Sequence, residues 1–175
     1  MEENDGPDFR LIAPSTKLLQ RDLSRGPRYA DGFYGIAPEI GRWGKIHAGS
    51  CHGEYTRSAR MKTGGSGSFK AEWTAEIPKE GVYEVWVWIP KVPMSNVQAY
   101  TVSGERLADQ NVEPSLREND RNSLGQFDLK RGKSHVVLSD RVPQGKKGEQ
   151  PVAQRGMRRG KPRIVADAVK WVKVK

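Results

Sequence analysis

Two consecutive stretches of the chain alternate apolar and polar residues with a period of two, and this pattern constrains the fold more than any other feature. The stretch FKAEWTAEI (69–77) places all its apolar side chains, including Trp73, on one phase. The stretch GVYEVWVWIP (81–90) places Tyr83, Val85, Val87 and Ile89 on one phase and Glu84, Trp86 and Trp88 on the other. Successive side chains of a strand point to opposite faces, so both stretches predict antiparallel strands with one buried face. The residues PKEG supply the turn between them.

Further strands are predicted along the chain at a spacing of roughly ten residues, the first of them near Trp43. A glycine-rich turn, TGGSGS, occupies residues 63–68. The polar segment 103–123 predicts a short hairpin or strand near Asp109, Gln110 and Val112, followed by a charged loop. The later strands are predicted at 97–102, 124–130, 134–140 and 163–174. This regular spacing of strands predicts an all-β fold, a jelly-roll-like β-sandwich of antiparallel strands.

Residues 1–40 lack strong alternation and predict an irregular or partly helical lead-in or inter-domain segment. A short helix is expected over 14–26, with Ser15 as its N-cap and Gly26 as its stop. The sandwich domain itself is expected over 41–175.

The positive charge is concentrated in one late segment. Residues 141–175 hold eleven Lys and Arg against Glu149 and Asp167, which accounts for the whole net charge of +9, so residues 1–140 are neutral. Within this segment the loop 141–163 is rich in Pro and Gly, which predicts an irregular connection. The functions open to this loop are binding of an acidic glycan or another polyanion, or a solvated insertion. Nucleic acid is a weaker expectation, because the loop has no aromatic residue on which a base could stack. The polyanion candidates are Arg155, Arg158, Arg159, Lys161 and Arg163.

The sequence indicates neither a reducing nor an oxidising compartment, because the single cysteine, Cys51, cannot form an internal disulfide. No run of about 18 apolar residues is present, and the acidic start MEENDGPDF does not resemble a secretory signal. The chain is therefore either cytosolic or a fragment or mature region of a longer exported protein.

Several strands together resemble the golvesin and xanthan-lyase carbohydrate-binding-like domain. The similarity covers roughly residues 43–174 and is carried by FKAEWTAEIPKEGVYEVWVWIP, NVQAYTV, NSLGQFDLKRGKSHVVLSD and VADAVKWV, in this order and spacing. The resemblance implies a non-catalytic jelly-roll module that accompanies other domains in exported bacterial proteins, including polysaccharide-degrading enzymes. It also implies a location that is secreted, periplasmic or at the cell surface. Specific binding residues are not implied.

No motif predicts catalysis, a metal or a cofactor. The segment HAGSCHGE gathers His47, Cys51, His52 and Glu54, but zinc sites usually combine two separated pairs of ligands. The third histidine, His135, lies in a predicted strand. Asp167 is the one carboxylate of the last strand, and it is expected to anchor the backbone through hydrogen bonds rather than to bind calcium, which requires six to eight oxygen ligands.

Aromatic rings are the expected glycan contacts, because a planar ring packs against the apolar face of a sugar. Two hypotheses remain open for Trp86 and Trp88, which lie opposite the core phase of their strand. They form either a ligand surface or a docking surface covered by the lead-in or by a neighbouring domain, in which case the domain is a structural spacer. Trp73 and Phe127 are assigned to the core. The glycan-binding candidates are Trp43, Tyr55, Trp86, Trp88 and Tyr100.

Overall fold

The computed structural model describes residues 6–14, 34–35, 43–53, 57–92, 97–103, 105–106, 110–111, 121–141 and 162–174. These residues form strands and turns and contain no helix that is long and apolar enough to cross a bilayer. The strands are β1 (Phe9–Ile12), β2 (Tyr34–Gly35), β3 (Gly44–His47), β4 (Ser58–Thr63), β5 (Lys70–Ile77), β6 (Gly81–Trp88), β7 (Val97–Val102), β8 (Glu105–Arg106), β9 (Gln110–Asn111), β10 (Asn122–Leu129), β11 (Gly132–Ser139), β12 (Arg163–Ala166) and β13 (Ala168–Lys173).

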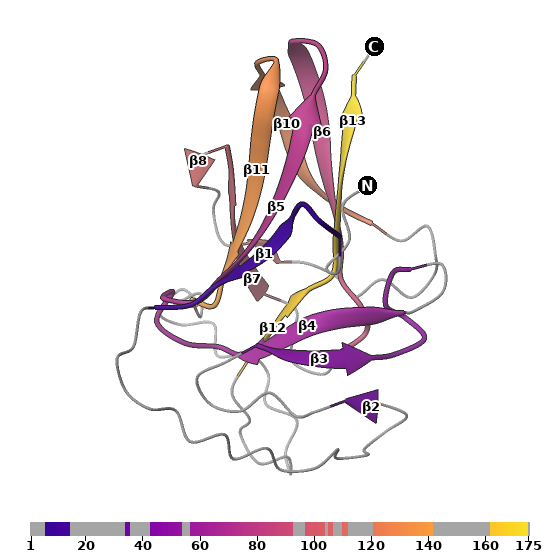
Figure 1. Ribbon diagram of the computed structural model, residues 1–175, viewed down its shortest axis with the longest axis vertical. Helices are drawn as coiled ribbons and strands as arrows, with labels where there is room; N and C mark the ends of the chain where they lie inside the picture. The colour runs from indigo at the N-terminus through magenta and orange to yellow at the C-terminus, as the bar shows by residue number, and fades with distance from the viewer. Residues whose placement is uncertain are drawn as a thin grey trace.

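Two antiparallel sheets face each other and enclose the main core. One sheet has the strand order β1-β5-β11-β7-β8, with β9 also paired to β7, and the other has the order β10-β6-β13. Their long strands run roughly vertically in Figure 1. The all-β sandwich predicted from the alternation is therefore confirmed.

The alternating stretches supply the core as predicted. Trp73 is 1% exposed, and Tyr83, Val85 and Val87 of β6 are buried in the same cluster. Phe127 of β10 lies opposite Tyr83 in the register and is also buried. Each of these strands buries one phase of its side chains because the other sheet covers that face.

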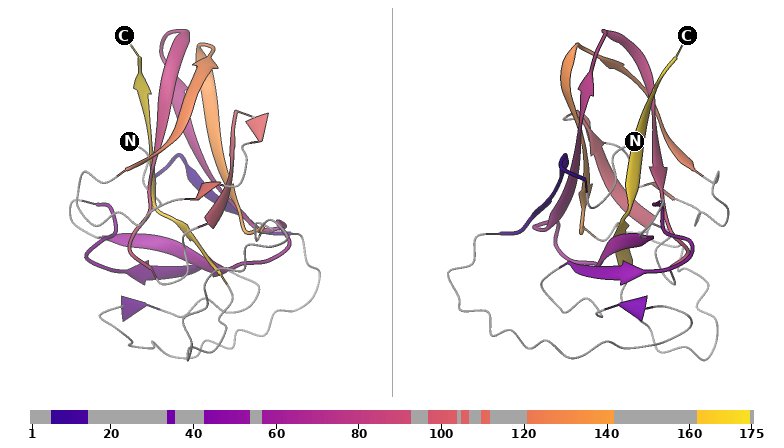
Figure 2. Two further views of the ribbon diagram at one scale, coloured as in Figure 1. Left: turned by 180° about the vertical axis from the view of Figure 1, so that it is seen from behind. Right: turned by 45° about the vertical axis from the view of Figure 1, so that its right-hand side comes forward.

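A third sheet, with the order β12-β4-β3-β2, lies across one end of the sandwich. Figure 2 shows from two further sides that β3 and β4 run across one end of the long strands. A second apolar cluster, which includes Ile46, Met61 and Val165, lies beneath this sheet.

The last predicted strand is divided between two sheets at Asp167. β12 pairs with β4, whereas β13 pairs with β6, and Asp167 is the residue between them. The sequence predicted one strand over 163–174 because its apolar residues continue on both sides of Asp167.

Three strands, β1, β2 and β4, were not predicted. β1 pairs with β5 from Phe9↔Trp73 to Ile12↔Lys70, so the expectation of an irregular segment was wrong for these residues. β4 was missed because all but two of its residues are buried, on both phases, which erases the alternation. The expected helix over 14–26 lies outside the described residues except for Pro14.

Candidate functional site

Trp86 lies on the outer face of the three-stranded sheet. Its neighbours across the two flanking strands are Ser123 of β10 and Lys170 of β13. The ring is half-buried, and so is Lys170. On the same strand phase, Glu84 accepts a hydrogen bond of 2.8 Å from the Ser123 hydroxyl. This face, which we call the Trp86 face, combines one aromatic ring with donors and acceptors suited to sugar hydroxyls.

Trp88 does not share this exposure, although it lies on the same phase of β6. It is 6% exposed, its indole N–H donates to the Ser50 carbonyl at 2.8 Å, and its ring lies 5.4 Å from that of His52. The loop after β3 therefore covers it. Of the two alternatives that the sequence left open for Trp88, the structure favours the covered ring, and the candidate ligand contact at this residue is not exposed.

Tyr100 is also buried, at 2% exposure, and belongs to the main core cluster. Its hydroxyl lies 3.5 Å from Gln98, which is fully buried. The expectation that Tyr100 contacts a glycan was therefore wrong. Trp43 is half-buried and packs against the main core, and Tyr55 lies outside the described residues.

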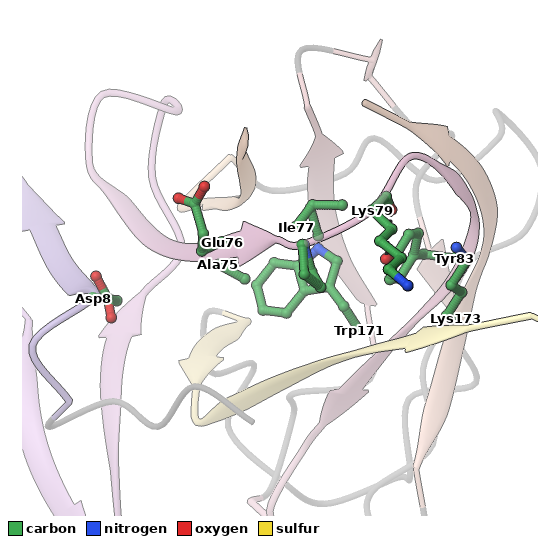
Figure 3. Close-up of a pocket in the computed structure, with 9 residues that line it drawn as sticks. Asp8, Ala75, Glu76, Ile77, Lys79, Tyr83, Trp171 and Lys173 are labelled. Atoms are coloured by element: carbon green, nitrogen blue, oxygen red, sulfur yellow. Dashed lines mark hydrogen bonds between the residues drawn. The ribbon is translucent and has the colours of Figure 1, made fainter. Parts of the chain in front are cut away.

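A groove that the sequence did not predict opens between the edges of the two sheets (Figure 3). Its volume is about 540 Å³, and the Trp171 ring lies at its centre. The signal in the sequence was the alternation of β13, which puts Trp171 and Lys173 on the inward phase with Val169. The residues that line this groove are Asp8, Ala75, Glu76, Ile77, Pro78, Lys79, Tyr83, Trp171 and Lys173.

Asp167 acts as the predicted backbone anchor. It is 1% exposed, and one carboxylate oxygen accepts the His52 backbone N–H at 2.9 Å.

Burial, reinforced by the Asp167 carboxylate, raises the pKa of the Cys51 thiol from 9.0 to about 12. The same two causes raise the pKa of the Tyr100 phenol far above its ordinary value. A thiol with this pKa is protonated at neutral pH and is a poor nucleophile.

The histidines form no metal-binding cluster in the described part of the chain, where no three His, Cys, Asp or Glu side chains are grouped. Glu54 lies outside the described residues. His135 is on β11, and its Nδ1 lies 3.1 Å from the Thr74 hydroxyl and 3.6 Å from Glu72 Oε1. Arg10 of β1 also pairs with Glu72, at 2.6 Å, so this carboxylate ties β1 to the sheet.

Of the five polyanion candidates in the basic loop, only Arg163 is among the described residues. Arg163 begins β12, is half-buried and pairs with Thr63 in the register. The other four, Arg155, Arg158, Arg159 and Lys161, lie outside the described residues. Polyanion binding through this loop stays a prediction.

A buried ion pair, also not predicted, holds the glycine-rich turn. Lys62 Nζ lies 3.1 Å from Asp140 Oδ2, and the two side chains are 5% and 1% exposed. Asp140 Oδ1 accepts the backbone N–H groups of Gly67 at 2.8 Å and Phe69 at 3.2 Å. Gly65 has no room for a side chain, because a Cβ there would lie 2.4 Å from Asp140 Oδ2.

Comparison with known proteins gives a family and a fold. No curated protein matches the chain in sequence. Among solved structures, a xanthan lyase from Paenibacillus has 22% sequence identity and a TM-score of 0.52, over 85% of this chain and 12% of the lyase chain. This level of identity shows a shared fold, and this chain spans a small part of the lyase's length.

Two further solved structures are more distant. The GH26-CBM35 β-(1,4)-mannanase of Podospora anserina has 14% identity and a TM-score of 0.46, over 83% of this chain and 28% of that one. The exo-β-1,3-galactanase of Phanerochaete chrysosporium has 13% identity and a TM-score of 0.41, over 60% and 26%. The sequence itself matches the model of the Golvesin C-terminal domain over residues 35–173, from the end of β2 to the end of β13. This chain therefore belongs to the Golvesin C-terminal domain family.

Proposed function

We propose that this domain is a non-catalytic accessory module that binds polysaccharide through the Trp86 face. The observation that carries the proposal is the position of Trp86, a half-buried ring on the solvent side of a sheet with Ser123 and Lys170 on either side. A fixed ring with flanking polar groups can stack on a sugar while the polar groups bond its hydroxyls.

The family and the fold support a carbohydrate-related role. A xanthan lyase, whose name describes an enzyme acting on a polysaccharide, has a region with the same fold. We infer that this chain likewise works beside other domains of a longer bacterial protein, in a secreted, periplasmic or cell-surface location. It would then hold its partner domain close to the polymer and raise the local concentration of substrate.

Affinity gel electrophoresis against neutral and acidic polysaccharides tests this proposal. The wild-type domain is expected to be retarded by at least one polymer, and Trp86→Ala to be retarded less by the same polymer. The matched control is Gln126→Ala, because Gln126 is exposed on the same face but has no ring. Wild-type mobility unchanged by every polymer, or retardation that Trp86→Ala leaves as strong as in the wild type, would overturn the proposal.

A second candidate function rests on three exposed valines on the same sheet face. Val82, Val172 and Val174 are 41%, 38% and 37% exposed, and the Val174 backbone N–H donates to the Val82 carbonyl at 2.9 Å. Clustered apolar side chains at a surface favour contact with another protein surface. This would make the domain a structural spacer that docks on a neighbouring domain of its own chain. Changing the valines to Ser or Thr should then free the two domains from each other, as measured by small-angle scattering of a two-domain protein.

A further inference from the structure

We propose that the groove around Trp171 is a second saccharide subsite and that it takes a sugar unit bearing a carboxylate, such as a uronic acid. This inference rests on the proposed function, because it assigns one class of ligand to a carbohydrate-binding module. It concerns a site on the inner side of β13, whereas the Trp86 face lies on its outer side.

The groove exists because the two sheets are not closed along this edge. β1 pairs with β5 only as far as Trp73, and the last contact of this segment is the Thr74 N–H donating to the Asp8 carbonyl at 2.9 Å. Beyond it, β5 presents Ala75 on its inward phase, and this small side chain leaves space opposite Trp171. A volume of about 540 Å³ lies in the range of small-molecule sites.

Trp171 is fixed before any ligand arrives. Its indole N–H donates to the Ser134 hydroxyl at 3.2 Å, and that hydroxyl lies 2.9 Å from the hydroxyl of Ser103. The ring also packs against the main core cluster. With its only polar group satisfied internally, the ring presents an apolar surface to the groove and loses little conformational entropy on binding.

The charges of the groove are separated along its length (Figure 3). Asp8 lies at one end, where the Glu76 carboxylate points away from Trp171, and Lys79 and Lys173 lie at the other end beside Tyr83. Lys173 Nζ donates to the Glu80 carbonyl at 3.2 Å and lies 5.9 Å from the centroid of the Tyr83 ring. An ammonium has three donors, so Lys173 can also bind an anion.

This arrangement matches an acidic sugar better than a neutral one. A sugar carboxylate at the basic end would accept from the two ammonium groups, while a ring hydroxyl at the other end would donate to Asp8. The sugar ring between them would lie against Trp171. A neutral sugar would leave the two lysines without an anionic partner.

The experiment compares two oligosaccharides of equal length and linkage by calorimetry, cellotetraose and a β-1,4-linked tetramer of glucuronic acid. The acidic tetramer is expected to bind more tightly than cellotetraose, and the double variant Lys79→Gln/Lys173→Gln to lose about tenfold of that affinity, since exposed charge pairs contribute up to about 1 kcal/mol each. The matched control is Lys70→Gln/Lys91→Gln, which removes two exposed charges outside the groove and should leave binding unchanged.

A second variant tests the space rather than the charge. Ala75→Leu is expected to fill the groove and to abolish binding of the acidic tetramer while leaving thermal unfolding near that of the wild type. In ¹⁵N-labelled protein the tetramer should shift the Trp171 indole resonance, which is assigned by its disappearance in Trp171→Phe. Equal affinity for the two tetramers, or a shift confined to the Trp86 resonance, would overturn the inference.

The two proposals fail in different ways. If Trp86→Ala abolishes polysaccharide binding and the groove variants bind as the wild type does, the inference about the groove is wrong and the proposed function stands. If the wild type binds no polysaccharide and neither tetramer, both are wrong.

Discussion

Replacing Asp140 by Asn tests whether the buried ion pair with Lys62 holds the glycine-rich turn in place. The substitution keeps the shape of the side chain and one oxygen for the N–H groups of Gly67 and Phe69. It removes the charge that lies 3.1 Å from Lys62 Nζ, so a buried ammonium loses its anionic partner.

The size of the effect follows from what Lys62 retains. Removing one partner of a buried pair costs about 3–5 kcal/mol of the free energy of unfolding. Lys62 Nζ still donates to the Thr63 carbonyl at 3.3 Å and lies 4.2 Å from the Phe69 ring centroid. We therefore expect the lower end of the range, about 3 kcal/mol, which for a domain of this size lowers Tm by roughly 6–12 °C.

Urea unfolding followed by tryptophan fluorescence measures this change. The matched control is Asp128→Asn, the same chemical change at an exposed carboxylate of β10, expected to alter stability by less than about 0.5 kcal/mol. The double variant Lys62→Met/Asp140→Asn removes both charges and should recover much of the loss, giving a coupling energy above about 1 kcal/mol. A loss in Asp140→Asn as small as that of the control, or additive effects in the double variant, would refute the reasoning.

Three further predictions follow from the site. Trp86→Ala should weaken retardation in polysaccharide gels while shifting the urea midpoint little, because the ring is only half-buried; a large loss of stability would mean that the ring is a packing residue. Trp88→Ala should lower the free energy of unfolding by about 3–5 kcal/mol, because the side chain is 6% exposed and bonded to Ser50, and a stable variant with altered glycan binding would contradict its burial. Cys51 should react with a thiol reagent at pH 8 only in the unfolded protein, because its pKa is raised to about 12 in the fold. Because the pKa of Cys51 is higher in the folded than in the unfolded protein, the thiol adds to the free energy of unfolding below pH 9, and this contribution should fall as pH rises from 9.0 to about 12. The variant Cys51→Ala should not show this fall in stability. Prompt labelling of Cys51 in the folded protein would contradict the prediction.

The main sandwich could be predicted because its strands are amphipathic. β5, β6, β10 and β11 each bury mainly one phase, and their bounds agree with the alternating stretches to within about two residues. β4 could not be predicted in this way, since four of its six residues are buried on both phases. β1 is too short, at four residues, to show a period before its partner is known.

The candidate site was harder to predict than the fold. Of the five aromatic residues chosen as glycan contacts, Trp86 is the one on the outer sheet face that stays partly exposed, and Trp88 and Tyr100 are covered. Trp171 was not among the chosen residues. Whether an inward ring is covered depends on the strand opposite, and here that strand presents Ala75.

The sequence by itself determined the antiparallel sandwich, its core phase and the family, because these depend on periodicity and on the order of local motifs. The tertiary structure decided which rings meet solvent. The loop after β3 covers Trp88, the loss of pairing beyond Trp73 opens the groove at Trp171, and a division between sheets at Asp167 gives the last strand two partners. Each of these outcomes depends on contacts between segments distant in the chain, and such contacts leave no local pattern in the sequence.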